Sequence, residues 1–150
     1  MNEPDLQAVY RERVLTHSKQ PLNFRRQENC DCEATGFNQL CGDKVSVYLT
    51  LENDTVTDAS FEGAGCAISI ASASMMTEAL LGCTVTEAEQ LLEQAATIFT
   101  ADTAPTNPRL DNIKALEGVK QYPSRIKCAT LAWQTLAAAL QGNNETVTTE

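Results

Sequence analysis

Two stretches of alternating apolar and polar residues, joined by a short turn, constrain the fold more than any other feature of this sequence. Between residues 44 and 51, apolar side chains occupy every second position, which is typical of a strand with one buried face. Residues 52–54 favour a turn, and a second strand is predicted over residues 55–61. The two strands are expected to pair as an antiparallel hairpin. A shorter strand over residues 36–40 would complete a three-stranded sheet.

The second half of the sequence has a helical character. Residues 66–81 are rich in Ala, Ser and Met and contain no Gly or Pro, which suits a closely packed helix. A capping box formed by Thr84 with Glu87, or by Thr86 with Glu89, would begin the next helix.

Four further segments complete the predicted organisation. Apolar residues at helical spacing predict an amphipathic helix over residues 5–17. Residues 100–109 contain two prolines and are expected to form a loop, followed by a short helix over residues 110–117. Ser124, after Pro123, is expected to cap a final helix. Because the strands come first and the helices after them, we predict an α+β fold. It has a three-stranded antiparallel sheet with helices packed mainly on one face.

Length and charge narrow the class of protein. The chain has 150 residues and a formal charge of −9. This length fits one domain over residues 1–141, followed by a tail over residues 142–150 that is expected to be disordered. The negative charge argues against binding to nucleic acid or to an anionic membrane, because both require a basic surface.

The N-terminus lacks the apolar stretch of a secretory signal, and no apolar run approaches the roughly 20 residues that span a bilayer. We therefore expect a cytoplasmic protein.

Six cysteines in a reducing compartment indicate metal or sulfur chemistry rather than disulfides. Cys41 and Asp43 come just before the first long strand, and Cys66 lies between the second strand and the helix that follows. Cys128 is expected in the first turn of the final helix. Side chains at the ends of elements can converge, and three thiolates with one carboxylate suit tetrahedral zinc or iron.

This ligand set has chemical consequences. Around Zn²⁺ it would carry a formal charge near −2, which Arg125 and Lys127, on either side of Cys128, could balance. A carboxylate holds zinc less tightly than a thiolate does, so the site could exchange a ligand and release a reactive thiol. Cys41 is the preferred candidate, because its neighbour Gly42 leaves the approach open. A simpler interpretation is that the cysteines are small buried apolar residues, and their spacing alone leaves both interpretations open.

The other cysteines and the only histidine carry weaker signals. Cys30 and Cys32 are interpreted as incidental loop cysteines rather than as a functional dithiol. Cys83 is interpreted as a packing or surface residue, and a supporting or surface role is expected for His17.

Several motifs occur in an order that resembles a known family. They are Cys41-Gly42-Asp43, Phe61-Glu62-Gly63-Ala64-Gly65-Cys66-Ala67-Ile68-Ser69 and Pro123-Ser124-Arg125-Ile126-Lys127-Cys128-Ala129-Thr130-Leu131. Over roughly residues 17–140 the chain resembles the SufU branch of the IscU-like (NifU N-terminal-like) iron–sulfur cluster assembly proteins. Lys127 stands where the scaffold branch has a histidine, which favours the sulfur-transfer branch.

The resemblance implies an IscU-like fold and a Zn²⁺ site made by Cys41, Asp43, Cys66 and Cys128. It also implies that a SufS-type cysteine desulfurase donates sulfur to Cys41 as a persulfide, and that SufBCD-type assembly machinery acts downstream. Arg125 would balance the charge of the site or contact the desulfurase. The protein would then be a sulfurtransferase that works with a desulfurase rather than a stand-alone enzyme.

Two alternatives stay open at this point. The first is a scaffold on which a [2Fe–2S] cluster is assembled, with iron or a transient cluster held by the same thiolates. The second is a non-catalytic interaction module that is stabilised by zinc.

Overall fold

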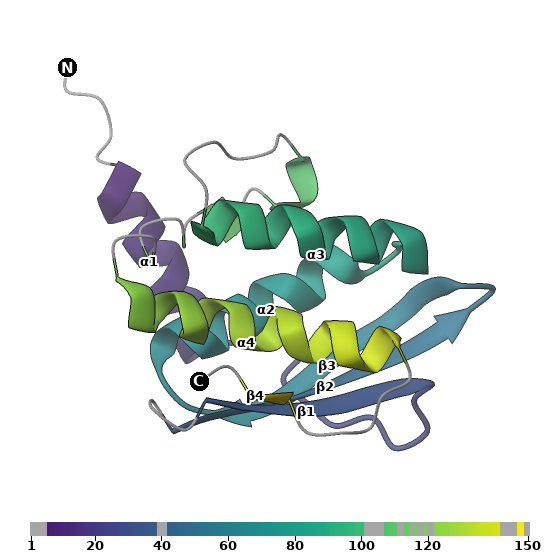
Figure 1. Ribbon diagram of the computed structural model, residues 1–150. Helices are drawn as coiled ribbons and strands as arrows, with labels where there is room; N and C mark the ends of the chain where they lie inside the picture. Colours follow the sequence, from purple (N-terminus) through teal and green to yellow (C-terminus); the bar gives the residue numbers. More distant parts are fainter. Residues whose placement is uncertain are drawn as a thin grey trace.

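The computed structural model describes residues 6–38, 42–100, 107–110, 113–114, 116, 119, 122–141 and 147–148. Its helices are α1 (Leu6–Lys19), α2 (Ala67–Leu80), α3 (Val85–Thr100) and α4 (Pro123–Leu140), with a 3₁₀ turn η1 (Pro108–Leu110). Its strands are β1 (Cys32–Asn38), β2 (Asp43–Glu52), β3 (Thr55–Ala64) and β4 (Val147–Thr148). The helices gather on one side of the sheet, which confirms the predicted α+β arrangement (Figure 1). Within the described part of the chain, no helix has the length and apolar character to span a membrane.

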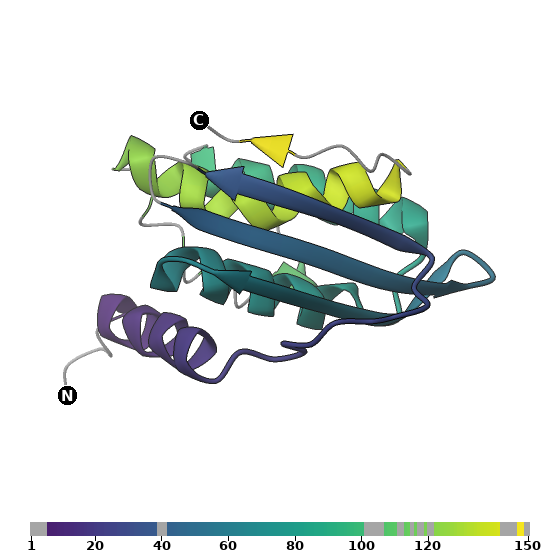
Figure 2. The ribbon, with the colours of Figure 1, turned by 90° about the horizontal axis from the view of Figure 1, so that it is seen from below.

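The strand order in the sheet is β3-β2-β1-β4 (Figure 2). The three long strands are antiparallel, as predicted. β1 begins at Cys32, earlier than the predicted start at residue 36, because β2 is long enough to pair with it from Leu49 onward. β4 adds to the free edge of β1 in parallel. The two residues of β4 belong to the tail that is expected to be disordered. The other residues of the range 142–150 lie outside the described residues.

The turn between β2 and β3 shows why the sequence forms a hairpin here. Asn53 and Asp54 both have positive φ, at 54° and 62°, and Glu52 pairs with Thr55 on either side of them. Two central residues with positive φ are the mark of a type I′ turn, whose twist matches that of paired strands. Asn and Asp tolerate this conformation better than most residues do. The predicted turn is therefore confirmed.

The helix starts match the sequence at α3 and differ from it at α4. Thr84 and Glu87 form the predicted capping box, because each backbone N–H donates to the other's side chain at 3.1 Å. By contrast, Ser124 is not the cap of α4. The helix starts two residues earlier than a Ser124 cap would give, at Pro123, with Tyr122 at the N-cap position and no capping side chain. Proline suits the first helical position because its φ is preset and it has no N–H to satisfy.

The segment between α3 and α4 is only partly described. Residues 101–106 of the predicted loop lie outside the described residues, and α3 itself extends to Thr100. Of the short helix predicted over residues 110–117, Leu110 belongs to η1. Ile113, Lys114 and Leu116 also have 3₁₀ conformation, and the other positions of that range lie outside the described residues.

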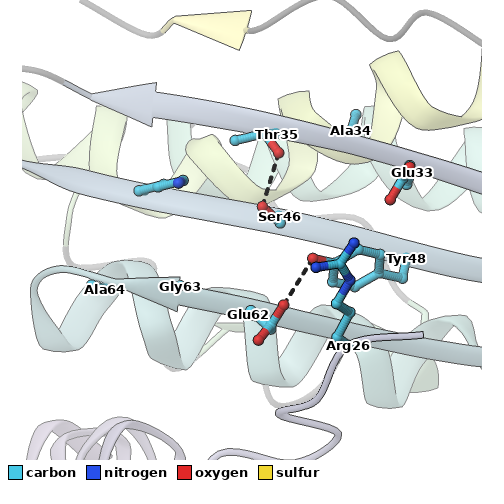
Figure 3. A pocket seen from close by; sticks show the side chains of 10 residues that line it. Arg26, Glu33, Ala34, Thr35, Ser46, Tyr48, Glu62, Gly63 and Ala64 are labelled. Carbon is cyan, nitrogen blue, oxygen red and sulfur yellow. Dashed lines mark hydrogen bonds between the residues drawn. The ribbon is translucent and has the colours of Figure 1, made fainter. Parts of the chain in front are cut away.

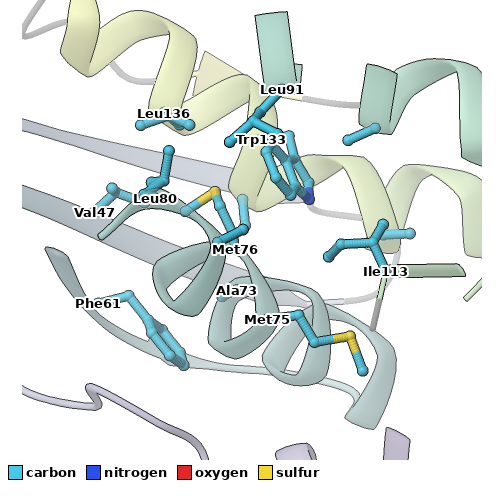
Figure 4. Packing of buried hydrophobic residues seen from close by; sticks show 14 of the residues in the cluster. Val47, Phe61, Ala73, Met75, Met76, Leu80, Leu91, Ile113, Trp133 and Leu136 are labelled. Carbon is cyan, nitrogen blue, oxygen red and sulfur yellow. The ribbon is translucent and has the colours of Figure 1, made fainter. Parts of the chain in front are cut away.

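The core lies between the helices and the sheet (Figure 4). Met76 and Leu136 lie among the largest fully buried side chains, and α2 is buried along almost its whole length. Its small side chains permit close packing: the Ser72 hydroxyl donates to the backbone carbonyl of Ala129 in α4 at 2.6 Å. Helix α4 also lies very close to β1 at Gly36. A Cβ atom added there would be 2.1 Å from Thr135 Oγ1, so only glycine fits. This contact fixes α4 across β1.

Among the helices that the structure describes, none covers the opposite face of the sheet (Figure 2). It has an open hollow of about 540 Å³ lined mainly by polar side chains (Figure 3). The Tyr48 hydroxyl donates to Glu62 at 2.9 Å, and the hydroxyls of Thr35 and Ser46 are 2.8 Å apart. The described residues that line this hollow include no cysteine and no histidine, so it does not compete as a soft-metal site.

His17 fastens the end of α1 to α2. Its Nδ1 is 2.7 Å from the Ser74 hydroxyl, which also accepts the Leu22 backbone N–H at 2.8 Å. In the tautomer with its proton on Nε2, His17 can accept the Ser74 hydroxyl proton at Nδ1. Burial lowers the pKa of His17 below its usual 6.5, although the Glu78 carboxylate acts in the opposite direction. The supporting role predicted for His17 is thus a helix-docking role.

Acidification is expected to weaken the fold through His17. Because the pKa of His17 is lower in the folded state, the unfolded chain binds the proton more readily. The contribution of neutral His17 is complete above the usual pKa of 6.5 and is lost as the pH falls through 6.5 towards the lowered value. Urea unfolding at about pH 7.5 and about pH 5.5 should show a smaller loss of stability in His17→Gln than in the unsubstituted protein. Equal losses in the two proteins would contradict this prediction.

Candidate metal centre

Three of the predicted site residues come together at one end of the sheet. Asp43 is the first residue of β2, Cys66 is the N-cap residue of α2, and Cys128 lies in α4. One ligand atom from each lies within 4.8 Å of the other two. The sequence predicts Cys128 in the first turn of the final helix. Because α4 begins at Pro123, Cys128 lies in the second turn instead. Asp43 and Cys128 are buried, and Cys66 is partly exposed, so the cluster can be reached from the Cys66 side.

The loop between β3 and α2 holds the Asp43 carboxylate in place. Its Oδ1 accepts the backbone N–H of Cys66 at 2.8 Å, and its Oδ2 is 3.7 Å from Cys66 Sγ. Gly65 has a φ of +153°, and a Cβ at this position would be 2.2 Å from Asp43 Oδ1. Only glycine therefore leaves room for the carboxylate beside the N-terminus of α2, where backbone N–H groups favour negative charge.

The separations of the donor atoms fit a tetrahedral metal site. With Zn–S bonds of about 2.3 Å and Zn–O bonds of about 2.1 Å, tetrahedral geometry places sulfur and oxygen about 3.6 Å apart and two sulfurs about 3.8 Å apart. The observed distance between Asp43 Oδ2 and Cys66 Sγ is 3.7 Å. The third donor, Cys128 Sγ, lies within 4.8 Å of both others. Two sulfurs and one oxygen can thus bind a soft or borderline divalent ion and leave a position for a fourth ligand.

Asn38, which the sequence analysis did not single out, also belongs to this cluster. It is the last residue of β1, is 0% exposed, and its Nδ2 is 4.0 Å from Cys128 Sγ. A polar residue three positions before Cys41 gives only a weak signal, since polar residues are common at strand ends. The register of β1 could have revealed it, because Ala34, Gly36 and Asn38 share the face that points to α4.

Of the remaining predicted site residues, the structure describes two and leaves out one. Cys41 lies outside the described residues. Arg125 is exposed and Lys127 is partly exposed, and both lie beside Cys128 in α4. Among the described residues, the one ion pair joins Arg25 to Asp58, so no ion pair connects Arg125 or Lys127 to Asp43. Their proposed roles therefore do not rest on a contact with the carboxylate.

The other cysteines lie away from the cluster. Cys83 is fully buried, its Sγ is 3.4 Å from the Ala79 carbonyl oxygen, and burial raises the pKa of its thiol. This confirms its interpretation as a packing residue. Cys30 precedes β1 and Cys32 begins it, at the end of the strand opposite Asn38. Burial raises the pKa of both thiols, which disfavours the reactive thiolate.

Comparison with known proteins identifies the family. The sequence pattern of the NifU-like N-terminal domain matches residues 9–148. The chain belongs to this family. One member, the zinc-dependent sulfurtransferase SufU of Bacillus subtilis, is 38% identical over 88% of this chain and 89% of its own length. Another, the iron–sulfur cluster assembly scaffold protein IscU of Thermotoga maritima, is 36% identical over 89% of this chain and 93% of its own length.

Solved structures of the family agree with the fold described above. A crystal structure from Fervidobacterium islandicum AW-1, described as an iron–sulfur cluster assembly scaffold protein for the SUF system, superposes with a TM-score of 0.82. It is 36% identical and covers 89% of this chain and 98% of that one. An N-terminal NifU-like protein from Brucella abortus superposes with a TM-score of 0.81 at 26% identity, over 91% of this chain and 95% of that one. The IscU-like fold implied by the sequence motifs is thus confirmed, and the protein is a member of an iron–sulfur cluster assembly family.

Proposed function

We propose that this protein accepts sulfane sulfur from a SufS-type cysteine desulfurase, with Cys41 as the acceptor thiol. In this proposal Cys41, Asp43, Cys66 and Cys128 hold a Zn²⁺ ion, and the reaction takes place in the cytoplasm, where thiols stay reduced. SufBCD-type assembly machinery would receive the sulfur. The protein acts only together with its desulfurase.

One observation carries the proposal: donor atoms of Asp43, Cys66 and Cys128 lie within 4.8 Å of one another, and the separation of 3.7 Å between Asp43 and Cys66 suits tetrahedral zinc. Cys41 is two residues before Asp43 in the chain, so it is the natural source of the fourth ligand. The relative from Bacillus subtilis supports the proposal further, because its name joins zinc dependence with sulfurtransferase activity.

The chemistry assigned to the residues is a thiol–persulfide exchange. A bound Zn²⁺ ion would keep the cysteines deprotonated at neutral pH. The Cys41 thiolate attacks the terminal sulfur of the desulfurase persulfide, and the sulfur–sulfur bond of the donor breaks. The desulfurase cysteine leaves as a thiolate, and Cys41 becomes the new persulfide. No net oxidation occurs, because one sulfur–sulfur bond replaces another.

A scaffold for a [2Fe–2S] cluster is the second candidate function. It is favoured by the names of relatives such as the Thermotoga maritima protein, which is called a scaffold. Cysteine thiolates of the same set could hold such a cluster.

Sulfur acceptance is tested by incubating the zinc-loaded protein with desulfurase and L-cysteine and then recording its intact mass. The proposed function predicts that one sulfur atom is added, that peptide mapping places it on Cys41, and that desulfurase turnover increases. Anaerobic reconstitution with iron and sulfide tests the scaffold, which should develop the absorption of a [2Fe–2S] cluster. A protein that retains zinc but gains no sulfur and does not stimulate the desulfurase would instead be a zinc-stabilised interaction module.

A further inference from the structure

Asn38 is buried next to the metal centre without being one of its proposed ligands. It ends β1, pairs in register with Asp43 of β2, and is 0% exposed. A buried carboxamide is costly unless it is hydrogen-bonded, so its position requires a partner. The Cys128 Sγ atom, 4.0 Å from Asn38 Nδ2, is such a partner.

Two of the contacts of Cys128 Sγ use the sulfur in opposite hydrogen-bonding roles. The Ser124 carbonyl oxygen, 3.6 Å away, can only accept a hydrogen bond, and the S–H group donates to it. Asn38 Nδ2 can only donate, so it interacts favourably with the sulfur lone pairs and most strongly with a thiolate. A sulfur atom that is bound to a metal carries no proton, so it has no hydrogen to donate to Ser124 but can still accept from Asn38.

The charge of the proposed centre makes such a donor useful. Three thiolates and one carboxylate around Zn²⁺ leave an excess of negative charge in a region where Asp43 and Cys128 are buried. Among the described residues, no ion pair joins Asp43 to a cation. Donors that bind the ligands of a metal are known to orient them and to raise the affinity of the site.

We propose that Asn38 is a positioning residue of the metal centre: its side-chain N–H group binds the Cys128 thiolate and keeps Cys128 on the metal. This inference rests on the proposed function, since it assumes that the centre holds zinc. It gives Cys128 a different role from Cys41, because the donated hydrogen bond lowers the charge and nucleophilicity of the Cys128 sulfur. Cys128 thus stays a ligand while another cysteine accepts sulfur.

The first test compares the zinc affinity of three proteins by competition with a chromophoric chelator. Asn38→Leu removes the donor at similar volume, and we expect its affinity to fall about 10- to 100-fold. Asn38→Asp keeps the shape but places a negative oxygen where the donor was, so its affinity should fall further. Gln27→Leu is the matched control, because Gln27 is also a buried amide, but it donates to the Tyr48 carbonyl and the Ser60 hydroxyl on the face of the sheet away from the helices.

The second test uses the unsubstituted protein and so does not depend on how the variants fold. Loaded with ¹¹³Cd²⁺, it should give a ¹H–¹¹³Cd correlation to the Asn38 side-chain amide, transmitted through the N–H···S bond and Cys128. Neither a backbone role nor a packing role for Asn38 would produce this signal.

The possible outcomes separate this inference from the proposed function. Equal zinc affinity in Asn38→Leu and the unsubstituted protein would overturn the role of Asn38, as would an equal loss in Gln27→Leu or the absence of the ¹¹³Cd correlation. Failure of the unsubstituted protein to bind zinc would contradict the proposed function itself.

Discussion

Cys41→Ala is expected to reduce sulfur acceptance to the background level while the fold is retained. The proposed reaction needs a thiolate that can leave the centre and attack a persulfide, and alanine cannot supply one. Asp43, Cys66 and Cys128 remain in the variant to bind metal. The measurement is the intact mass after incubation with desulfurase and L-cysteine, together with circular dichroism to confirm the fold.

Cys30→Ala is the matched control for this experiment. Cys30 is a partly exposed cysteine that lies before the opposite end of β1, so its loss should leave sulfur acceptance unchanged. Full transfer by Cys41→Ala would exclude Cys41 as the acceptor. Sulfur mapped to Cys66 or Cys128 in the unsubstituted protein would also exclude Cys41 as the acceptor.

Gly65→Ala is expected to lower zinc affinity by about 10- to 100-fold, the range found when the support of a metal ligand is disturbed. The new Cβ would be 2.2 Å from Asp43 Oδ1 and 3.0 Å from Asp43 Cα, so the carboxylate must move. Moving it also breaks the hydrogen bond from the Cys66 backbone N–H. Competition with a chromophoric chelator measures the affinity, and thermal unfolding reports any general loss of stability.

Gly82→Ala separates the collision at Gly65 from simple backbone strain. Gly82 also has a positive φ, +84°, but the nearest atom to a Cβ there is an Arg109 nitrogen at 3.9 Å. This control should lose about 1–2 kcal/mol of stability, the cost of a left-handed backbone, and keep its zinc affinity. If Gly65→Ala behaves in the same way as Gly82→Ala, the proposed support of Asp43 is wrong.

Local patterns were sufficient to predict most of the fold. Alternation over residues 44–51, the turn at Asn53-Asp54 and the capping box of Thr84 and Glu87 all depend on near neighbours in the sequence, and all are confirmed. Features that depend on distant partners were missed or misplaced. The early start of β1 reflects pairing with β2, and β4 forms on the edge of β1, which no pattern in its own two residues indicates.

The same distinction applies to the site. The chemistry of Cys, Asp and Cys at element ends suggested a metal centre, and the structure brings Asp43, Cys66 and Cys128 together. Spacing alone could not establish this, because convergence depends on how α4 crosses the sheet. Gly36 and Thr135 make a close contact at that crossing. The role proposed for Asn38 depends on the same crossing, and its signal in the sequence is weak.

The donors of the cluster come from distant parts of the chain, and this makes a bound metal a long-range cross-link. Asp43 and Cys66 are 23 residues apart, and Cys128 follows much later, in the last long helix. A metal joining them closes two loops of the unfolded chain, whose closure entropy grows only slowly with length. Binding energy at such a site is also folding energy. Release of the ion would therefore remove this cross-link between the donors, while the buried apolar face of α4 keeps the helix on the core.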